Sequence, residues 1–280
     1  MRVACIQTEP RFGETARNVD RTCELIEQAA ERGADVVVLP ELCSTGYVFA
    51  SREEALALAE PVPGGPTTDR WLDLCRTLGV TLVAGIAERD GDKLFNSSVV
   101  LGPDGHVGTF RKLHLWNEEG LWFEPGDRGV PVFQTPHGRI ATFICYDGWF
   151  PECYRLAALG GAELVCIPTN WVPIPGQAEG QPAMATILCM ASAHSNSVVV
   201  AAADRVGVER GQPFIGQSVI VSHTGWPLAG PATVDEEEIL IADVDLVAAR
   251  RDRRWNDFND PLRDRRPDVY DEHARVTSTP

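Results

Sequence analysis

The sequence predicts an α/β fold with a mixed system of β-sheets and helices on the outside. Short apolar runs rich in valine and isoleucine alternate with helical periodicity along nearly all of the 280 residues. Such alternation is typical of strands and helices packed in layers. No repeat, low-complexity tract or linker divides the sequence, and the connections are too short for separate lobes. Residues 1–280 are therefore expected to form one domain, with residues 250–280 as a C-terminal arm.

The first half of the chain predicts two helices and five strands. Apolar residues recur every three or four positions from Val19 to Ala30, which indicates the first helix. A second helix has Thr67 or Thr68 as its N-cap and ends near Leu78. A turn at Pro103-Asp104-Gly105 joins two antiparallel strands. The expected strands are Val3–Thr8, Asp35–Leu39, Val80–Ala87, Asn96–Leu101 and His106–Arg111.

The second half repeats the alternation. A second hairpin has its turn at Pro136-His137-Gly138 and leads into a strand over Arg139–Cys145. Helices are expected at 151–159 and 177–195, and strands at 163–168, 197–203, 214–221 and 238–243. The tail from Arg250 to Tyr270 is dense in charge and is interrupted by Trp255, Phe258 and Leu262. Two interpretations of this tail stay open: a solvated arm, or a contact with a partner chain.

The composition and charge exclude several classes of partner. Hydrophobic residues make up 44% of the chain, and 25 Lys and Arg against 40 Asp and Glu leave a net charge of −15. A charge of this sign repels phosphate backbones and anionic lipid surfaces, so we expect no nucleic acid and no membrane partner. No apolar run has membrane-spanning length, and the run at the N-terminus is too short for a secretory signal.

The eight cysteines are spread along the chain with no dense framework. A domain with a core of this size needs no disulfide bonds for stability. No C-x-x-C motif or Cys/His cluster occurs in the sequence, so no metal site is expected. These features favour a cytoplasmic protein with reduced thiols.

Three polar residues stand at the carboxyl ends of predicted strands, where open α/β sheets bind their ligands. They are Glu41, Lys112 and Cys145. Each alone has an ordinary structural interpretation: a surface carboxylate, a lysine guarding a sheet edge, and a small thiol in the core. Together they indicate acyl transfer, because a thiol needs a base or a cation to become a nucleophile, and a cation also stabilises an oxyanion. None of the six histidines has an obvious pairing with the thiol, so a Cys/His hydrolase is disfavoured.

The segments around these residues resemble the nitrilase superfamily of carbon–nitrogen hydrolases. Leu39-Pro40-Glu41-Leu42-Cys43-Ser44-Thr45-Gly46-Tyr47 is similar to the segment of the general base. Thr109-Phe110-Arg111-Lys112-Leu113-His114-Leu115 is similar to the lysine motif, and Phe143-Ile144-Cys145-Tyr146-Asp147-Gly148-Trp149-Phe150-Pro151-Glu152 to the nucleophile motif. The resemblance extends from Val3 to about Tyr270. It implies a four-layer αββα sandwich that pairs to αββααββα in a dimer, and it implies no cofactor.

The resemblance also implies roles for individual residues. Glu41 matches the general base, Lys112 the lysine that stabilises the oxyanion, and Cys145 the nucleophile. Glu119 matches a further acid that helps to position substrate, with Glu118 as the alternative. The residues expected to bind substrate are Tyr47, Tyr146, Trp149, Asn170 and Trp171; for the last two, a turn and a surface aromatic are equally good interpretations.

The expected reaction is hydrolysis of a small aliphatic carboxamide to a carboxylate and ammonia through a thioester. A tyrosine directly after the nucleophile favours the amidase and carbamoylase branches, and four tryptophans near the expected mouth indicate a compact apolar pocket. Alternatives are an aliphatic nitrile or an N-carbamoyl compound, for which Arg155 or Arg205 would bind a substrate carboxylate. A non-enzymatic alternative is a catalytically silent scaffold. The expected partners are a small-molecule substrate and a second copy of the chain.

Overall fold

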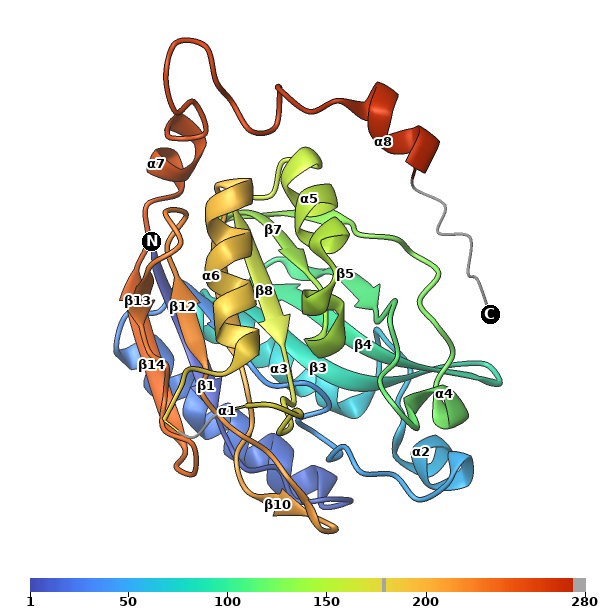
Figure 1. The fold of residues 1–280 in the computed structure, drawn as a ribbon. Helices are drawn as coiled ribbons and strands as arrows, with labels where there is room; N and C mark the ends of the chain where they lie inside the picture. Colours follow the sequence, from blue (N-terminus) through green and yellow to red (C-terminus); the bar gives the residue numbers. More distant parts are fainter. Residues whose placement is uncertain (178–179, 274–280) are drawn as a thin grey trace.

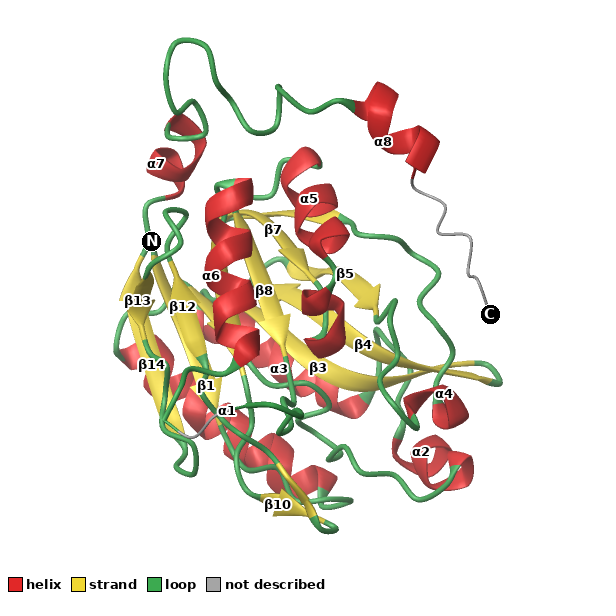
Figure 2. Ribbon diagram, in the orientation of Figure 1, coloured by secondary structure: helices red, strands yellow, loops and turns green. Residues whose placement is uncertain are grey.

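Two six-stranded sheets pack face to face with helices on both outer sides (Figures 1 and 2). This computed structural model describes residues 1–177 and 180–273. The arrangement has four layers, helix–sheet–sheet–helix, which confirms the α/β class and the αββα sandwich expected from the sequence. Whether residues 1–280 form one independent domain stays a prediction.

The first sheet has the strand order β14-β1-β2-β3-β4-β5. Its centre is parallel, because β1 pairs with β2 and β2 with β3 in the same direction, whereas β14, β4 and β5 are added antiparallel. Valine-rich strands buried on both faces suit a parallel centre. The bounds are β1 Arg2–Gln7, β2 Val36–Val38, β3 Thr81–Asp90, β4 Lys93–Gly102, β5 Gly105–Arg111 and β14 Glu238–Asp243.

The second sheet repeats this plan in the order β13-β12-β9-β8-β7-β6. Its parallel centre consists of β7, β8 and β9, and antiparallel strands flank it on both sides. A separate pair, β10 and β11, forms a small hairpin. The bounds are β6 Val132–Thr135, β7 Gly138–Thr142, β8 Leu164–Pro168, β9 Val199–Ala203, β10 Val208–Glu209, β11 Gln212–Pro213, β12 Val219–Val221 and β13 Pro227–Ala229.

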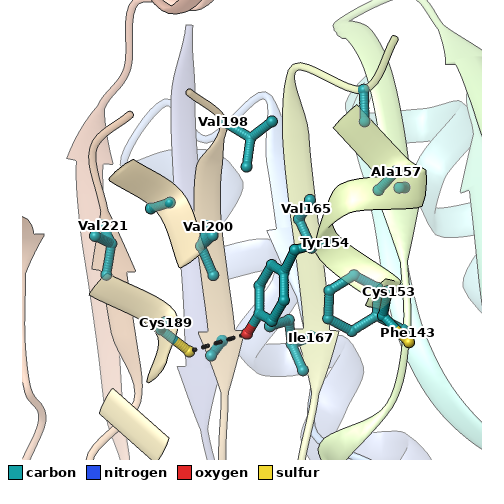
Figure 3. Close-up of a cluster of buried hydrophobic side chains, with 14 of the residues drawn as sticks. Phe143, Cys153, Tyr154, Ala157, Val165, Ile167, Cys189, Val198, Val200 and Val221 are labelled. Atoms are coloured by element: carbon teal, nitrogen blue, oxygen red, sulfur yellow. Dashed lines mark hydrogen bonds between the residues drawn. The ribbon is translucent and has the colours of Figure 1, made fainter. Parts of the chain in front are cut away.

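Four amphipathic helices cover the outer faces of the sheets. Helices α1 (Thr15–Glu31) and α3 (Pro66–Leu78) pack on the first sheet, and α5 (Pro151–Leu159) and α6 (Met184–Asn196) pack on the second. Figure 3 shows the core under α5 and α6, where the Tyr154 ring lies edge-on to Phe143 and its hydroxyl lies 3.8 Å from Cys189 Sγ. A further apolar layer of β-branched side chains joins the inner faces of the two sheets.

Several expected element boundaries were wrong, each for a local reason. The helix expected at 67–78 begins at Pro66 with Gly65 as its N-cap, because proline is preorganised for the first helical position, while Thr67 binds Glu60 instead. The helix expected from residue 177 begins at Met184, directly after Pro182 and Ala183. Proline disfavours helical geometry in the residue before it, which sets this late start.

Two expected strands are shorter than predicted. The strand expected at 214–221 begins only at Val219, because Gly216 and Gln217 both adopt positive φ angles, of 59° and 64°. The strand expected at 139–145 ends at Thr142, and Cys145 instead begins a 3-10 helix. The hairpin expected at Pro136-His137-Gly138 is confirmed, because β6 and β7 pair antiparallel across this turn. The sequence did not predict β10, β11, β13, α2 (Arg52–Leu58), α4 (Glu119–Trp122), α7 (Leu246–Arg251) or α8 (Pro267–His273).

The C-terminal arm leaves the body after α7 and runs past the ends of α5 and α6 to α8 (Figure 1). Leu262 packs against the core under α5 and α6, whereas Phe258 is 84% exposed. The structure therefore contains an arm with exposed aromatic residues, and residues 274–280 of the expected arm lie outside the described residues.

All eight cysteines are free and buried, as expected for reduced thiols in a protein that needs no disulfide bonds. Across residues 1–177 and 180–273, no helix combines the length and apolar character needed to cross a bilayer.

Candidate active site

Glu41, Lys112 and Cys145 converge where strands of the two sheets end. Glu41 follows β2 and Lys112 follows β5, and two antiparallel steps, β3 to β4 and β4 to β5, bring β5 back to the direction of β2. Their carboxyl ends therefore share one edge of the first sheet. Cys145 follows β7 of the second sheet, and the charges of Glu41 and Lys112 act on its thiol. The side chains of Glu41 and Lys112 are fully buried.

The Lys112 ammonium lies between two carboxylates. Its Nζ donates to Glu41 Oε1 at 2.6 Å and to Glu119 Oε1 at 2.7 Å. Burial by itself lowers the pKa of Lys112, but the charges of Glu119 and Glu41 outweigh it and raise this pKa, so the ammonium stays charged. Glu119, at the start of α4, is the acid that the structure brings to the lysine, while Glu118 is exposed.

The two carboxylate oxygens of Glu41 differ in their surroundings. Oε1 accepts hydrogen bonds from Lys112 and from Asn96 Nδ2, the latter at 2.6 Å, whereas Oε2 is buried with no hydrogen-bond partner among the described residues. Burial raises the pKa of Glu41 from 4.5 to about 7. The positive charge of Lys112 opposes this increase, and the negative charge of Glu119 adds to it. A carboxylate with this pKa exchanges a proton readily near neutral pH. The sequence did not point to Asn96; the available signal was a polar amide inside an apolar strand.

Cys145 lies on a sharp turn between β7 and the 3-10 helix Cys145–Trp149. Its φ angle is 44°, which is rare for any residue other than glycine and indicates local strain. Asp147 holds this turn: Oδ2 accepts the Ile144 N–H at 3.1 Å, and Oδ1 accepts the backbone N–H of His114 at 2.9 Å and lies 2.7 Å from its Nδ1. One buried carboxylate thus connects the nucleophile turn to the segment that follows Lys112.

Burial and the charge of Glu41 raise the pKa of the Cys145 thiol well above its usual value, while Lys112, Thr169 and the Asn170 N–H oppose the increase. The resting thiol is therefore protonated. Because a thiolate is the nucleophilic form, the site needs a base that takes this proton.

Tyr47 and two tryptophans form one wall of a small cavity beside Glu119. The Tyr47 hydroxyl donates to Glu119 Oε1 at 2.6 Å. Burial, with the charges of Glu119 and Glu41, raises the pKa of Tyr47 well above its usual value, so the phenol keeps its proton. The cavity measures about 90 Å³ and is lined by Tyr47, Val48, Phe49, Trp116, Asn117, Glu118, Glu119, Trp122, Val172 and Gln212.

Of the other residues expected to bind substrate, three aromatic side chains pack around the cavities and one amide supports the backbone of the site. Tyr146 packs edge-on against Trp116 with ring centroids 4.9 Å apart, and Trp149 and Trp171 line a second cavity of about 80 Å³. Asn170 supports the site through its amide, because Nδ2 donates to the backbone carbonyl of Glu41 at 3.0 Å. Trp171 is buried, so it is not a surface aromatic.

The two arginines considered for a substrate carboxylate lie elsewhere. Arg155 on α5 donates to the carbonyl oxygens of Ser195 and Pro261. Arg205 is buried and pairs with Glu209. Neither residue lines either cavity next to the candidate site.

One group of described residues brings together side chains of the types that bind metals: His114, Asp147 and Cys153. The Asp147 carboxylate already accepts two backbone N–H groups and faces the His114 ring, so its oxygens serve the nucleophile turn. The sequence-based expectation of no metal stays a prediction.

The family model for carbon–nitrogen hydrolases matches residues 2–254. A nitrilase from Pyrococcus abyssi is 42% identical over 270 residues, which cover 96% of this chain and 99% of that protein. An N-carbamoylputrescine amidase from Solanum lycopersicum is 34% identical over 92% of this chain and 89% of its own.

Solved structures agree with these relatives. A carbon–nitrogen hydrolase from Helicobacter pylori G27 superposes with a TM-score of 0.85 at 28% identity, covering 98% of both chains. An amidase from Nesterenkonia sp. AN1, in a structure that shows Michael addition of acrylamide at its active site cysteine, superposes with a TM-score of 0.79 at 27% identity, covering 98% of this chain and 99% of that one. The match of sequence and fold along nearly the whole chain shows that this protein belongs to the carbon–nitrogen hydrolase family of enzymes, the nitrilase superfamily.

Proposed function

We propose that the protein hydrolyses a small carboxamide to a carboxylate and ammonia through a thioester on Cys145. One observation carries the proposal: Lys112 holds Glu41 by Oε1, the buried Oε2 has no hydrogen-bond partner among the described residues, and the charge of Glu41 acts on the protonated thiol of Cys145. Such an oxygen is the natural acceptor for the thiol proton.

In the first step Glu41 takes the proton of Cys145 as the sulfur attacks the amide carbon. The carbonyl π electrons move to oxygen, and the new oxyanion needs positive partners. Lys112 has three N–H donors, of which two bind Glu41 and Glu119, so one is left for the oxyanion. The backbone N–H of Tyr146, in the first turn of the 3-10 helix, is the second donor.

The intermediate then collapses. Glu41 returns its proton to the amide nitrogen, the C–N bond breaks, and ammonia leaves, with the acyl group held as a thioester. A water molecule attacks the thioester carbon while Glu41 accepts one of its two protons. The C–S bond then breaks as that proton returns to sulfur, and the carboxylic acid gives its remaining proton to solvent and leaves as the carboxylate. Glu119 keeps Lys112 in place throughout and borders the cavity where the amide would lie.

The cavity favours a small substrate without a carboxylate. Its volume of about 90 Å³ is well below the 300–1,000 Å³ of pockets for larger ligands. No lysine or arginine is among the described residues that line it, whereas Glu118 and Glu119 are. A substrate with an anionic group would meet like charge there.

A second candidate is an N-carbamoyl amine, which the same residues would hydrolyse at the carbamoyl C–N bond. The acidic lining favours it, because Glu118 and Glu119 suit a cationic tail, and several relatives at 31–34% identity are named N-carbamoylputrescine amidase or citrullinase. A nitrile would use the same nucleophile through a thioimidate, and the relative from Pyrococcus abyssi is named a nitrilase.

Ammonia release over a panel of short aliphatic amides, nitriles and N-carbamoyl amines, with Cys145→Ala as the control, tests the proposal. We expect release from an uncharged short amide, lost in the variant. Release from nitriles or carbamoyl amines alone would replace the first candidate by one of the others. Release that persists in Cys145→Ala would refute the thioester chemistry.

We also propose that the protein is a homodimer that pairs through α5 and α6. These helices lie on the outer side of the second sheet and carry exposed apolar side chains, including Leu156, Leu159 and Ile187. An exposed apolar face on adjacent helices is typical of an interaction surface. A second copy on this face would continue the layers as αββααββα.

A further inference from the structure

Arg205 and Glu209 form a buried ion pair at the carboxyl end of β9, outside the catalytic residues. Arg205 Nη1 lies 2.7 Å from Glu209 Oε2, and both side chains are at least 95% buried. The rest of the guanidinium is engaged as well, because Nη2 donates to the Pro10 carbonyl at 3.0 Å and the group lies 4.1 Å from the centre of the Phe214 ring. A charge pair removed from water in this way is fixed in one geometry.

The second oxygen of Glu209 holds the turn that precedes α2. Oε1 accepts the backbone N–H groups of Tyr47 at 2.7 Å and Val48 at 2.6 Å. Gly46, directly before them, has a φ angle of 84°, and a Cβ atom there would lie 2.7 Å from Glu209 Oε2. The turn therefore wraps closely around this carboxylate and has room for glycine alone.

The same turn carries a side chain that reaches the catalytic centre. The Tyr47 phenol donates to Glu119 Oε1 at 2.6 Å, and that oxygen also accepts from Lys112. Phe214 contacts both ends of the arrangement, since it lies under the Arg205 guanidinium and edge-on to the Tyr47 ring at 6.0 Å. A continuous series of contacts thus leads from Arg205 through Glu209 and Tyr47 to Glu119.

We propose that Arg205 and Glu209 are positioning residues: they hold the backbone of Tyr47 so that its phenol keeps Glu119, and through it Lys112, in the reactive arrangement. The proposal rests on the proposed function, because it assigns the pair a task in that reaction. Hydrogen bonds to a charged acceptor are stronger and more directional than neutral ones, which suits a carboxylate to this task. The proposal also gives Arg205 a role other than binding a substrate carboxylate.

The expected consequence is a loss of reactivity that exceeds the loss of substrate binding. When Glu209 no longer holds the turn, the Tyr47 phenol leaves Glu119, and Lys112 is no longer held between two carboxylates at the distances that the reaction needs. Residues that hydrogen-bond to metal ligands change activity by about 10- to 100-fold when they are replaced, and we expect a loss of similar size here. The turn that Glu209 holds also lines the cavity through Tyr47 and Val48, so KM should rise as well, but kcat should fall by the larger factor.

The experiment compares Glu209→Gln, Tyr47→Phe and the double variant. The first readout is the rate at which iodoacetamide alkylates Cys145, followed by peptide mass spectrometry, because it needs no knowledge of the substrate. The second is kcat and KM for the best amide of the panel. We expect each single variant to lose about tenfold or more in rate and the double variant to lose no more than either, because both break one series of contacts.

Two further variants separate positioning from stability. Glu163→Gln is the matched control, since Glu163 is also buried, pairs with Arg250 and accepts the Arg139 N–H at 2.9 Å, but lies before β8 at the other end of the sheet. It should lose stability and keep the alkylation rate. Arg205→Lys keeps the charge beside Glu209 and should retain more of the rate than Arg205→Met.

If Glu209→Gln does not fold, because it leaves a buried arginine charge unpaired, the variant that combines Arg205→Met with Glu209→Gln removes both charges and takes its place. Three results would each overturn the positioning role. They are additive losses in the double variant, an alkylation rate per folded molecule that does not change in Glu209→Gln, and a rise in KM without a fall in kcat. Absence of alkylation of Cys145 in the unsubstituted protein would instead refute the proposed function, and the inference with it.

Discussion

The ionisation of Glu41 should control the reactivity of Cys145 near neutral pH. The perturbation is pH, with Glu41→Gln as the matched variant. Burial raises the pKa of Glu41 to about 7, so the ionised fraction rises from about 1/11 at pH 6 to about 10/11 at pH 8. Because only the carboxylate accepts the thiol proton, we expect the rate of alkylation of Cys145 to rise about tenfold over this range and to level off above it.

The shape of the profile distinguishes this mechanism from a thiol that ionises alone. A thiol without a base gains reactivity about tenfold per pH unit up to its own pKa, which for Cys145 is raised well above the usual value. The assay is alkylation by iodoacetamide at a series of pH values, with peptide mass spectrometry of the fragment that contains Cys145. In Glu41→Gln the plateau should disappear and the rate at pH 8 should fall by about 100-fold or more.

A rate that rises steadily through pH 8 in the unsubstituted protein, or an identical profile in Glu41→Gln, would refute the assignment of Glu41 as the base.

The titration of Glu41 should also make the free energy of unfolding depend on pH. A carboxyl whose pKa is higher in the folded state stabilises that state fully below pH 4.5, and this contribution is lost as pH rises through about 7. The difference of 7 − 4.5 = 2.5 pKa units corresponds to about 3 kcal/mol, so the unfolding free energy of Glu41→Gln should depend less on pH between 5 and 8.

Three further predictions concern the turn, the nucleophile segment and the assembly. Gly46→Ala should lose at least about 1 kcal/mol of unfolding free energy in urea, because alanine is strained at positive φ and its Cβ would meet Glu209; unchanged stability would contradict this. Asp147→Asn should cost about 1–3 kcal/mol and slow alkylation of Cys145, because asparagine has one acceptor oxygen in place of two, so either the Ile144 N–H or the His114 N–H loses its acceptor; an unaltered rate would show that the turn holds without it. Light scattering should give twice the chain mass for the unsubstituted protein and the single chain mass for Leu156→Glu; a monomer in both would exclude the proposed pairing.

The principal layers of the fold could be predicted because they depend on local patterns. The valine run at 36–38 is too apolar for any place but a buried strand, and the spacing from Val19 to Ala30 suits one buried helix face. The predicted start of a helix or strand was wrong where a single backbone feature decides it. Examples are Pro66 at the start of α3 and the positive φ angle of Gln217 before β12. The short helices α2 and α4 carry too few residues for periodicity to appear.

Sequence reasoning placed Glu41, Lys112 and Cys145 after strands, and the resemblance to the family selected Glu119. Glu41 and Lys112 meet because β2 and β5 run in the same direction and end at one edge of the first sheet, whereas Cys145 comes from the second sheet. The catalytic roles of these residues stay a prediction. Asn96 and Glu209 were missed as members of the site, since their partners lie 55 and 162 residues away in the chain. For the same reason, the sequence offered Arg205 only as a possible partner for a substrate carboxylate.

The sequence by itself determined the α/β class, the succession of the main strands along the chain and the candidate residues for the chemistry, because these follow from side-chain type, short-range spacing and motif resemblance. Only the tertiary structure showed which oxygen of Glu41 has no hydrogen-bond partner among the described residues and which acid binds Lys112. It also showed that Glu209 holds the turn of Tyr47. Those facts depend on angstrom-scale distances between segments from both sheets, and such distances are set by the packing of the whole core rather than by any local pattern.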